Sequence, residues 1–219
     1  MNDGLLFWGV RNPVRGLLHG ISACLALVGG VWLGVEADST EGRLSLLVFG
    51  VGLTALFVTS TLYHSAQWGP VGMRRMQRLD HSMIFILISA TFTPFAVLTL
   101  DGWFRAATLP LAWALALIGV VAVVKGAGTS ARRRVAAMIG LGWLSVFVAV
   151  PVVRELGAEA LVLLAAGGAT YSAGGLLFAT GWPRLWPRVF SYHEVFHTLV
   201  VLAAILHFIA VQHYLLPLA

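Results

Sequence analysis

The chain has 219 residues, of which 59% are hydrophobic and only 11% are charged, whereas a soluble domain carries about 25% charged residues. A soluble globule needs a charged shell and a disordered chain needs low hydrophobicity, so neither class fits. A nucleic-acid partner is not expected, because the basic residues behind the net charge of +5 are scattered along the chain. We therefore predict a polytopic membrane protein.

Seven apolar stretches are long enough to cross a hydrocarbon core about 30 Å thick as helices of roughly 20 residues. In chain order they are 17–35, 44–64, 80–100, 107–124, 135–153, 160–180 and 195–216. The first stretch exceeds the 7–15 residues of a signal-peptide core, so we expect it to remain as a span. The connections are short, and no composition shift divides residues 1–219. We predict an all-α integral membrane protein, a single domain formed by a bundle of seven transmembrane helices.

The few charged residues predict the orientation of the bundle. Eleven of the 14 basic residues precede the first span or follow the second, fourth and sixth spans. The positive-inside rule then places the amino terminus in the cytoplasm and the carboxyl terminus outside. The eleven are Arg11, Arg15, Arg74, Arg75, Arg78, Lys125, Arg132, Arg133, Arg134, Arg184 and Arg188, and the other three are Arg43, Arg105 and Arg154.

Ionisable side chains within spans are rare and mark functional sites. Five of the seven histidines lie at predicted cytoplasmic ends of spans, namely His19, His64, His81, His193 and His197. The other two, His207 and His213, lie further along the last span. Residues from several spans therefore meet at one membrane depth on one side.

The spacing of these residues predicts a metal site. His193 and His197 are four residues apart and share one helix face, at a separation of about 6 Å that suits one zinc ion. We choose His64 as the third ligand, because three histidines plus water are typical of catalytic zinc and favour zinc over magnesium. Ser60 lies one turn from His64, and Asp80 is placed to orient a zinc-bound water and accept its proton.

Other readings of the polar residues stay open at this point, since an isolated pair of histidines four residues apart is a weak signal. His81 is expected to face lipid headgroups, and His19 either reaches the interface or supports a ligand. His207 lies about 15 Å along the helix from His197, so we expect it to hydrogen-bond another helix. Glu194 points about 100° away from His193 and should meet the basic connections rather than the metal.

Two features are read as structural. Gly30 and Gly34 form a small-residue pattern typical of close helix packing. The run Arg132–Arg134 is interpreted as a headgroup and topology signal rather than a binding site.

A sparse motif connects these residues to a known family. It reads Ser60-x-x-x-His64, Asp80 and His193-x-x-x-His197. The sequence resembles, from about Asn12 to His213, the bacterial hemolysin III family of the progestin and adipoQ receptor superfamily, which is related to alkaline ceramidases. The resemblance implies a multi-pass protein of the bacterial inner membrane. It also implies a cytoplasmic-side zinc ion held by His64, His193 and His197, with Asp80 and Ser60 close to its water.

Three functions follow as hypotheses. The first is a zinc-dependent hydrolase of a lipid amide or ester, whose substrate enters from the bilayer and whose setting is membrane-lipid or fluidity homeostasis. Asp80 would act as its general base and Ser60 would orient the water. The second is a non-enzymatic sensor or receptor-like regulator stabilised by structural zinc. The third is a cytolytic protein, although so apolar a chain lacks the soluble form that secretion requires.

Overall fold

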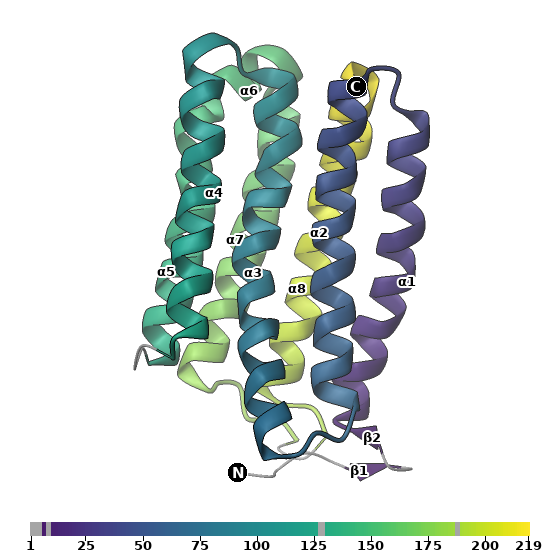
Figure 1. Cartoon of the computed structure of the whole chain (residues 1–219), viewed down its shortest axis with the longest axis vertical. Helices are drawn as coiled ribbons and strands as arrows, with labels where there is room; N and C mark the ends of the chain where they lie inside the picture. The colour runs from purple at the N-terminus through teal and green to yellow at the C-terminus, as the bar shows by residue number, and fades with distance from the viewer. Residues whose placement is uncertain (1–5, 8–9, 127–129, 187–188) are drawn as a thin grey trace.

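Seven helical spans run side by side in the computed structural model, which describes residues 6–7, 10–126, 130–186 and 189–219 (Figure 1). Each span is long and apolar enough to cross a membrane, which confirms the predicted all-α class. The first four are α1 (Pro13–Glu36), α2 (Thr40–Ser65), α3 (Pro70–Thr99) and α4 (Gly102–Val124). The fifth comprises α5 (Ala131–Trp143), η1 (Leu144–Val148) and α6 (Ala149–Leu156), and the sixth is α7 (Ala158–Thr180). The last comprises α8 (Tyr192–Ala210), η2 (Val211–Leu215) and η3 (Leu216–Leu218).

A short antiparallel hairpin precedes the first span and was not predicted. It pairs β1 (Leu6–Phe7) with β2 (Val10–Arg11). The hairpin lies at the end of the bundle opposite the carboxyl terminus (Figure 1). An odd number of spans requires this arrangement.

The helices extend well beyond the apolar segments that predicted them. The third begins at Pro70 rather than at residue 80, so Arg74, Arg75 and Arg78 lie on α3 and not in a connection. Proline is favoured in the first helical turn and arginine is a good helix former, so the helix continues where the hydropathy falls. Arg15 likewise lies on α1, and Arg132–Arg134 form the first turn of α5.

The fifth span is not the continuous helix that was predicted over 135–153. Residues Leu144–Val148 form a 3₁₀ segment between two α-helices. Pro151 follows in α6, and a proline removes one backbone hydrogen bond and clashes with the carbonyl four residues earlier, here Phe147. The proline therefore accounts for the local change of helix type.

A close helix contact joins α1 to α2. A Cβ atom added to Gly30 would lie 2.8 Å from the Cα of Gly50, and one added to Gly34 would meet the side chain of Leu47. Only glycine permits two backbones to approach in this way, so the predicted packing role of Gly30 and Gly34 is confirmed.

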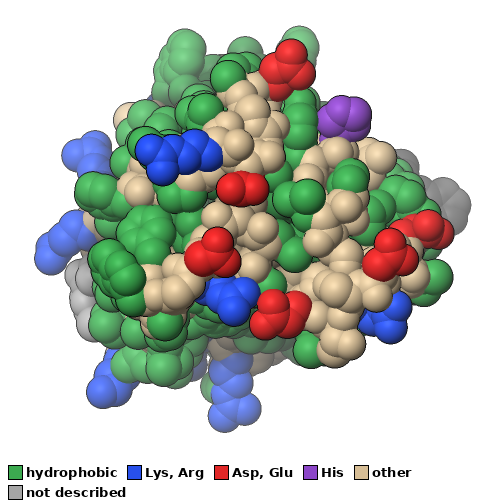
Figure 2. Space-filling view, turned by 90° about the horizontal axis from the view of Figure 1, so that it is seen from above, with side chains coloured by type: hydrophobic (Ala, Val, Ile, Leu, Met, Phe, Trp, Pro, Cys, Tyr) green, Lys and Arg blue, Asp and Glu red, His purple; other side chains and the backbone are tan. Residues whose placement is uncertain are grey.

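The outside of the bundle is apolar. Large side chains such as Leu25, Val28 and Phe147 are about 70% exposed, at 69%, 68% and 72% respectively. Seen from above, hydrophobic side chains form most of the outline, while acidic side chains stand on the end face (Figure 2). Such a surface suits contact with lipid tails along the sides and with water at the ends.

Candidate metal centre

Three histidines form one cluster, although they come from two helices that are far apart in the sequence. His64 lies at the end of α2, and His193 and His197 lie in the first two turns of α8. The ring centroid of His64 is 5.2 Å from that of His193 and 4.7 Å from that of His197, and the last two are 5.0 Å apart. One ring nitrogen from each residue lies within 4.8 Å of the others. The structure therefore brings together the three predicted ligands in a group that could hold one metal ion.

The start of α8 is held by a capping box. The backbone N–H of Ser191 donates a hydrogen bond to Oε2 of Glu194 at 2.8 Å, and the Ser191 side chain accepts one in return. The two bonds satisfy backbone donors that the first turn of a helix leaves open. They also set the orientation of the turn that carries His193.

Burial makes the cluster suitable for a metal. His64 and His197 are 3% and 2% exposed, and His193 is half-buried. Within the described part of the chain, no group hydrogen-bonds the buried Nε2 of His197. A buried polar atom without a partner costs about 1–3 kcal/mol. Coordination to a metal satisfies such a nitrogen, so this donor set fits a metal ion.

His19 supports the cluster from α1. It is 2% exposed and contacts His197, which favours the supporting role among the two readings that the sequence left open. Its Nε2 lies 3.0 Å from Nδ1 of His197, and the two rings pack edge to face with centroids 4.3 Å apart. The contact occupies Nδ1 of His197 and leaves Nε2 for a metal. A partner of this kind fixes the orientation of a ligating imidazole.

A second contact between α1 and α8 lies one turn away. Nε of Arg15 donates to Oε1 of Glu194 at 2.6 Å, and the two side chains are 18% and 8% exposed. Glu194 therefore meets a basic residue rather than the metal ligands, as its helical direction predicts. Its partner lies on a helix and not in a connection.

Asp80 and Ser60 lie beside the histidines. The buried Ser60 hydroxyl donates a hydrogen bond to the Asp80 carboxylate, which joins α3 to α2. Asp80 lines the same cavity as His193 and His197. Asp80 lies inside α3 rather than at its start, because that helix begins at Pro70.

A large cavity leads away from the cluster between α3 and α8. Its volume is about 770 Å³, within the range of small-molecule sites. Asp80, His81, His193 and His197 line its polar part, and most of the remaining wall is apolar, with Phe95 and Val152 among the residues of that wall. This cavity was not predicted, because its wall combines side chains from α2, α3, α4, the fifth span, α7 and α8.

Two further histidines, His81 and His207, lie outside the cluster. His81, which the sequence assigned to the headgroups, is half-buried and lines this cavity next to Asp80. His207 shares a hydrogen bond of 3.2 Å between its Nε2 and the Leu164 carbonyl oxygen on α7. This confirms that His207 contacts another helix, and His207 is not a member of the histidine cluster.

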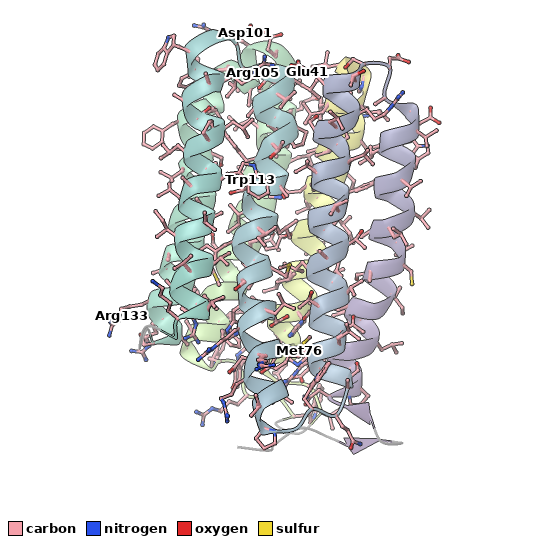
Figure 3. All side chains as sticks on the ribbon, in the orientation of Figure 1. Glu41, Met76, Asp101, Arg105, Trp113 and Arg133 are labelled. Atoms are coloured by element: carbon pink, nitrogen blue, oxygen red, sulfur yellow. The ribbon has the colours of Figure 1, made fainter. Side chains whose placement is uncertain are left out.

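Basic residues lie at both ends of the bundle. Arg133 lies at the end that carries the hairpin, and Arg105 lies at the opposite end, where it pairs with Glu41 at 3.3 Å (Figure 3). Met76 marks the hairpin end on α3, the helix that also carries Asp80 (Figure 3). Arg188 and the side chain of Arg11, which entered the predicted count, lie outside the described residues.

Comparisons with known proteins identify relatives over nearly the whole chain. The family described as Haemolysin-III related matches residues 7–208. Hemolysin-3 of Bacillus cereus is 30% identical over 206 residues, which cover 93% of this chain and 91% of that protein. The Hemolysin-3 homolog of Bacillus subtilis (strain 168) is 28% identical over 201 residues, covering 90% and 91%. The Monocyte to macrophage differentiation factor of Homo sapiens is 24% identical over 201 residues, covering 90% and 81%.

Proposed function

Since this chain belongs to the haemolysin-III-related family of multi-pass membrane proteins, we propose that it is a zinc-dependent hydrolase of a lipid amide or ester. The observation that carries the proposal is the position of the histidine cluster. Two of its members, His193 and His197, line a mostly apolar cavity of about 770 Å³. A site that combines metal ligands with an apolar cavity suits a substrate that has a polar reacting group and a long tail.

Zinc is the metal that the donor set favours. Three imidazoles suit zinc better than hard cations such as magnesium, and His64, His193 and His197 would hold it. A bound zinc ion supplies a Lewis acid for a carbonyl and lowers the pKa of a water molecule toward neutrality.

The side chains around the cluster have separate roles. Asp80 accepts the proton of the attacking water and returns it to the leaving group. Ser60 positions Asp80 through the hydrogen bond between their side chains. The apolar wall, with residues such as Phe95 and Phe104, holds the acyl chain and keeps bulk water away.

The number of protein ligands favours a hydrolase over a purely structural site. Structural zinc sites are usually closed by four protein ligands, whereas catalytic sites keep one position open. Among the residues that the structure describes, the group that could hold the metal has three members. A regulator or sensor built on the same fold needs no such open position.

Direct lysis of other membranes is the weaker alternative. The printed name of the Bacillus cereus relative refers to haemolysis. Exposed side chains such as Leu25 and Phe147 give the bundle an apolar exterior, which opposes the soluble form that a secreted toxin needs. Lysis by purified protein that survives His193→Ala would favour the lytic reading.

We further propose that the site faces the cytoplasm in the cell membrane of a bacterium and that the lipid enters sideways from the bilayer. The support is the end of the bundle at which Arg133 lies, together with the positive-inside rule (Figure 3). Single cysteines at Arg133 and Arg105 in a Cys24→Ser background test this orientation by labelling intact cells. A membrane-impermeant maleimide should label the cysteine at position 105 only.

The central experiment measures metal content and lipid cleavage in the same preparations. We expect wild-type protein to carry about one zinc ion and to release fatty acid from a panel of lipid amides and esters. His64→Ala and His197→Ala should lose both properties, whereas Asp80→Asn should keep the metal and lose cleavage. His213→Ala is the matched control, because this histidine is exposed and far along the last span.

Two results would contradict the proposal. Unchanged metal content in both histidine variants would show that these histidines do not bind the metal. Full cleavage activity in Asp80→Asn would show that Asp80 is not the general base.

A further inference from the structure

A second, smaller pocket lies at the hairpin end of the bundle, between α3, the end of α4 and the start of α5. Its volume is about 200 Å³, and a water molecule takes up about 30 Å³ in the liquid. The pocket therefore has room for a phosphate-sized group. It is lined by Gln77, Arg78, His81, Ala122, Val123, Gly126 and Arg134.

This polar pocket and the large cavity share part of their walls. Gln77, His81 and Arg134 line both of them. On α3, Gln77, Asp80 and His81 are spaced so that they lie on one helix face. The two cavities therefore adjoin at their three shared residues, and Asp80 lies on the same face of α3.

The pocket is built to hold negative charge. Arg78 and Arg134 both line it, so two guanidinium groups bring positive charge to one small pocket. In the described part of the chain, no carboxylate forms an ion pair with Arg78. An anion in the pocket gains attraction from both arginines, and the planar guanidinium fork matches the oxygens of a phosphate.

Gly126 leaves room for Arg78 at the wall of the pocket. Its φ angle is +62°, and a Cβ atom added there would lie 2.9 Å from Nη2 of Arg78. The guanidinium group therefore rests close to the backbone at a position where a side chain would displace it.

We propose that the pocket lined by Arg78 and Arg134 binds the phosphate headgroup of a lipid whose acyl chain occupies the large cavity. This inference rests on the proposed hydrolase for its reaction and adds the substrate class, a lipid with an anionic phosphate headgroup. The amide or ester bond then lies between the two ends, next to Asp80 and the histidine cluster. Neutral lipids of the same chain length lack the group that the arginines recognise.

Binding is measured separately from cleavage, so that the two proposals can fail independently. The Asp80→Asn protein is titrated with dioctanoyl phosphatidate, dioctanoylglycerol and inorganic phosphate in neutral detergent micelles, and native mass spectrometry counts the bound molecules. The test variant carries Arg78→Gln and Arg134→Gln. The matched control carries Arg74→Gln and Arg133→Gln, which remove equal charge from exposed positions outside both cavities; Figure 3 shows Arg133 pointing away from the bundle.

We expect phosphatidate to bind and the test variant to weaken it about tenfold for each arginine removed. The control variant should change the affinity less than twofold. Equal weakening in both variants would show diffuse surface charge and overturn the inference. Equally tight binding of dioctanoylglycerol, or of inorganic phosphate alone, would overturn it as well.

Two checks separate misfolding and failure of the hydrolase from failure of this pocket. Metal content and melting temperature of the test variant must match the control, and Arg78→Gln alone serves if Arg134→Gln disturbs the fold. If phosphatidate binding depends on the arginines but wild-type protein cleaves no lipid, the proposed hydrolase function is refuted and the proposed phosphate pocket stands. If the test variant cleaves lipids at an unchanged rate, the proposed phosphate pocket is refuted and the proposed hydrolase function stands.

Discussion

Replacing His19 by alanine tests whether α1 helps to build the metal site. The imidazole of His19 lies 3.0 Å from Nδ1 of His197 and is 2% exposed, so water does not readily take its place. Without it, the His197 ring loses the contact that holds its Nε2 toward the other ligands. The change removes no proposed ligand, so any loss of metal affinity reports positioning.

The size of the effect follows from this one contact. Removing the partner of a ligating histidine typically lowers metal affinity by about 10–100-fold. This corresponds to about 1.4–2.7 kcal/mol of binding free energy. The same change leaves Nδ1 of His197 buried without a partner, which lowers the free energy of unfolding by about 1–3 kcal/mol even in metal-free protein.

The assay is a competition for zinc between the purified protein and a chromophoric chelator, together with thermal unfolding in the same detergent. His19→Gln should recover part of the affinity, because its amide can bond the same ring nitrogen. His213→Ala should match wild type, since that side chain is exposed. Wild-type zinc affinity in a folded His19→Ala protein would refute the reasoning.

Two further substitutions test the contacts of α1 with α8 and with α2. Glu194→Gln keeps the acceptor of the capping box but leaves Arg15 without its counter-charge, so thermal unfolding should show a loss of about 1–3 kcal/mol. Glu41→Gln should change stability by less than about 0.5 kcal/mol, because that carboxylate is 71% exposed, and an equal loss in both variants would contradict the argument. Gly30→Ala should cost about 1–3 kcal/mol, since its Cβ would lie 2.8 Å from a backbone atom of α2. Gly140→Ala is the control, because the added Cβ would meet no neighbouring atom within 4 Å, so stability should stay unchanged or rise. A Gly30→Ala variant as stable as wild type would refute the close contact.

Local hydropathy was sufficient to predict the number of spans. Each span must bury its own backbone in lipid, so its apolar length is visible without knowledge of its neighbours. The same local signal misplaced several helix ends. It follows transfer into lipid and not helix propensity, so α3 was predicted to begin ten residues after its real start at Pro70.

The members of the histidine cluster were also predicted from the sequence. His193 and His197 share a face by helical spacing alone, and His64 and Asp80 stand out because ionisable groups are scarce in the spans. The sequence did not decide the role of His19, because its partner lies 178 residues away and the contact depends on how α1 packs on α8.

The sequence by itself determined that this chain is a seven-span membrane protein with a cluster of histidines at one membrane depth, because composition and helical spacing act within single segments. Only the tertiary structure decided which side chains surround that cluster. The cavity next to His193 and the basic pocket at Arg78 and Arg134 are made by residues from several helices. Their shapes depend on the packing of those helices against one another, which no single segment encodes.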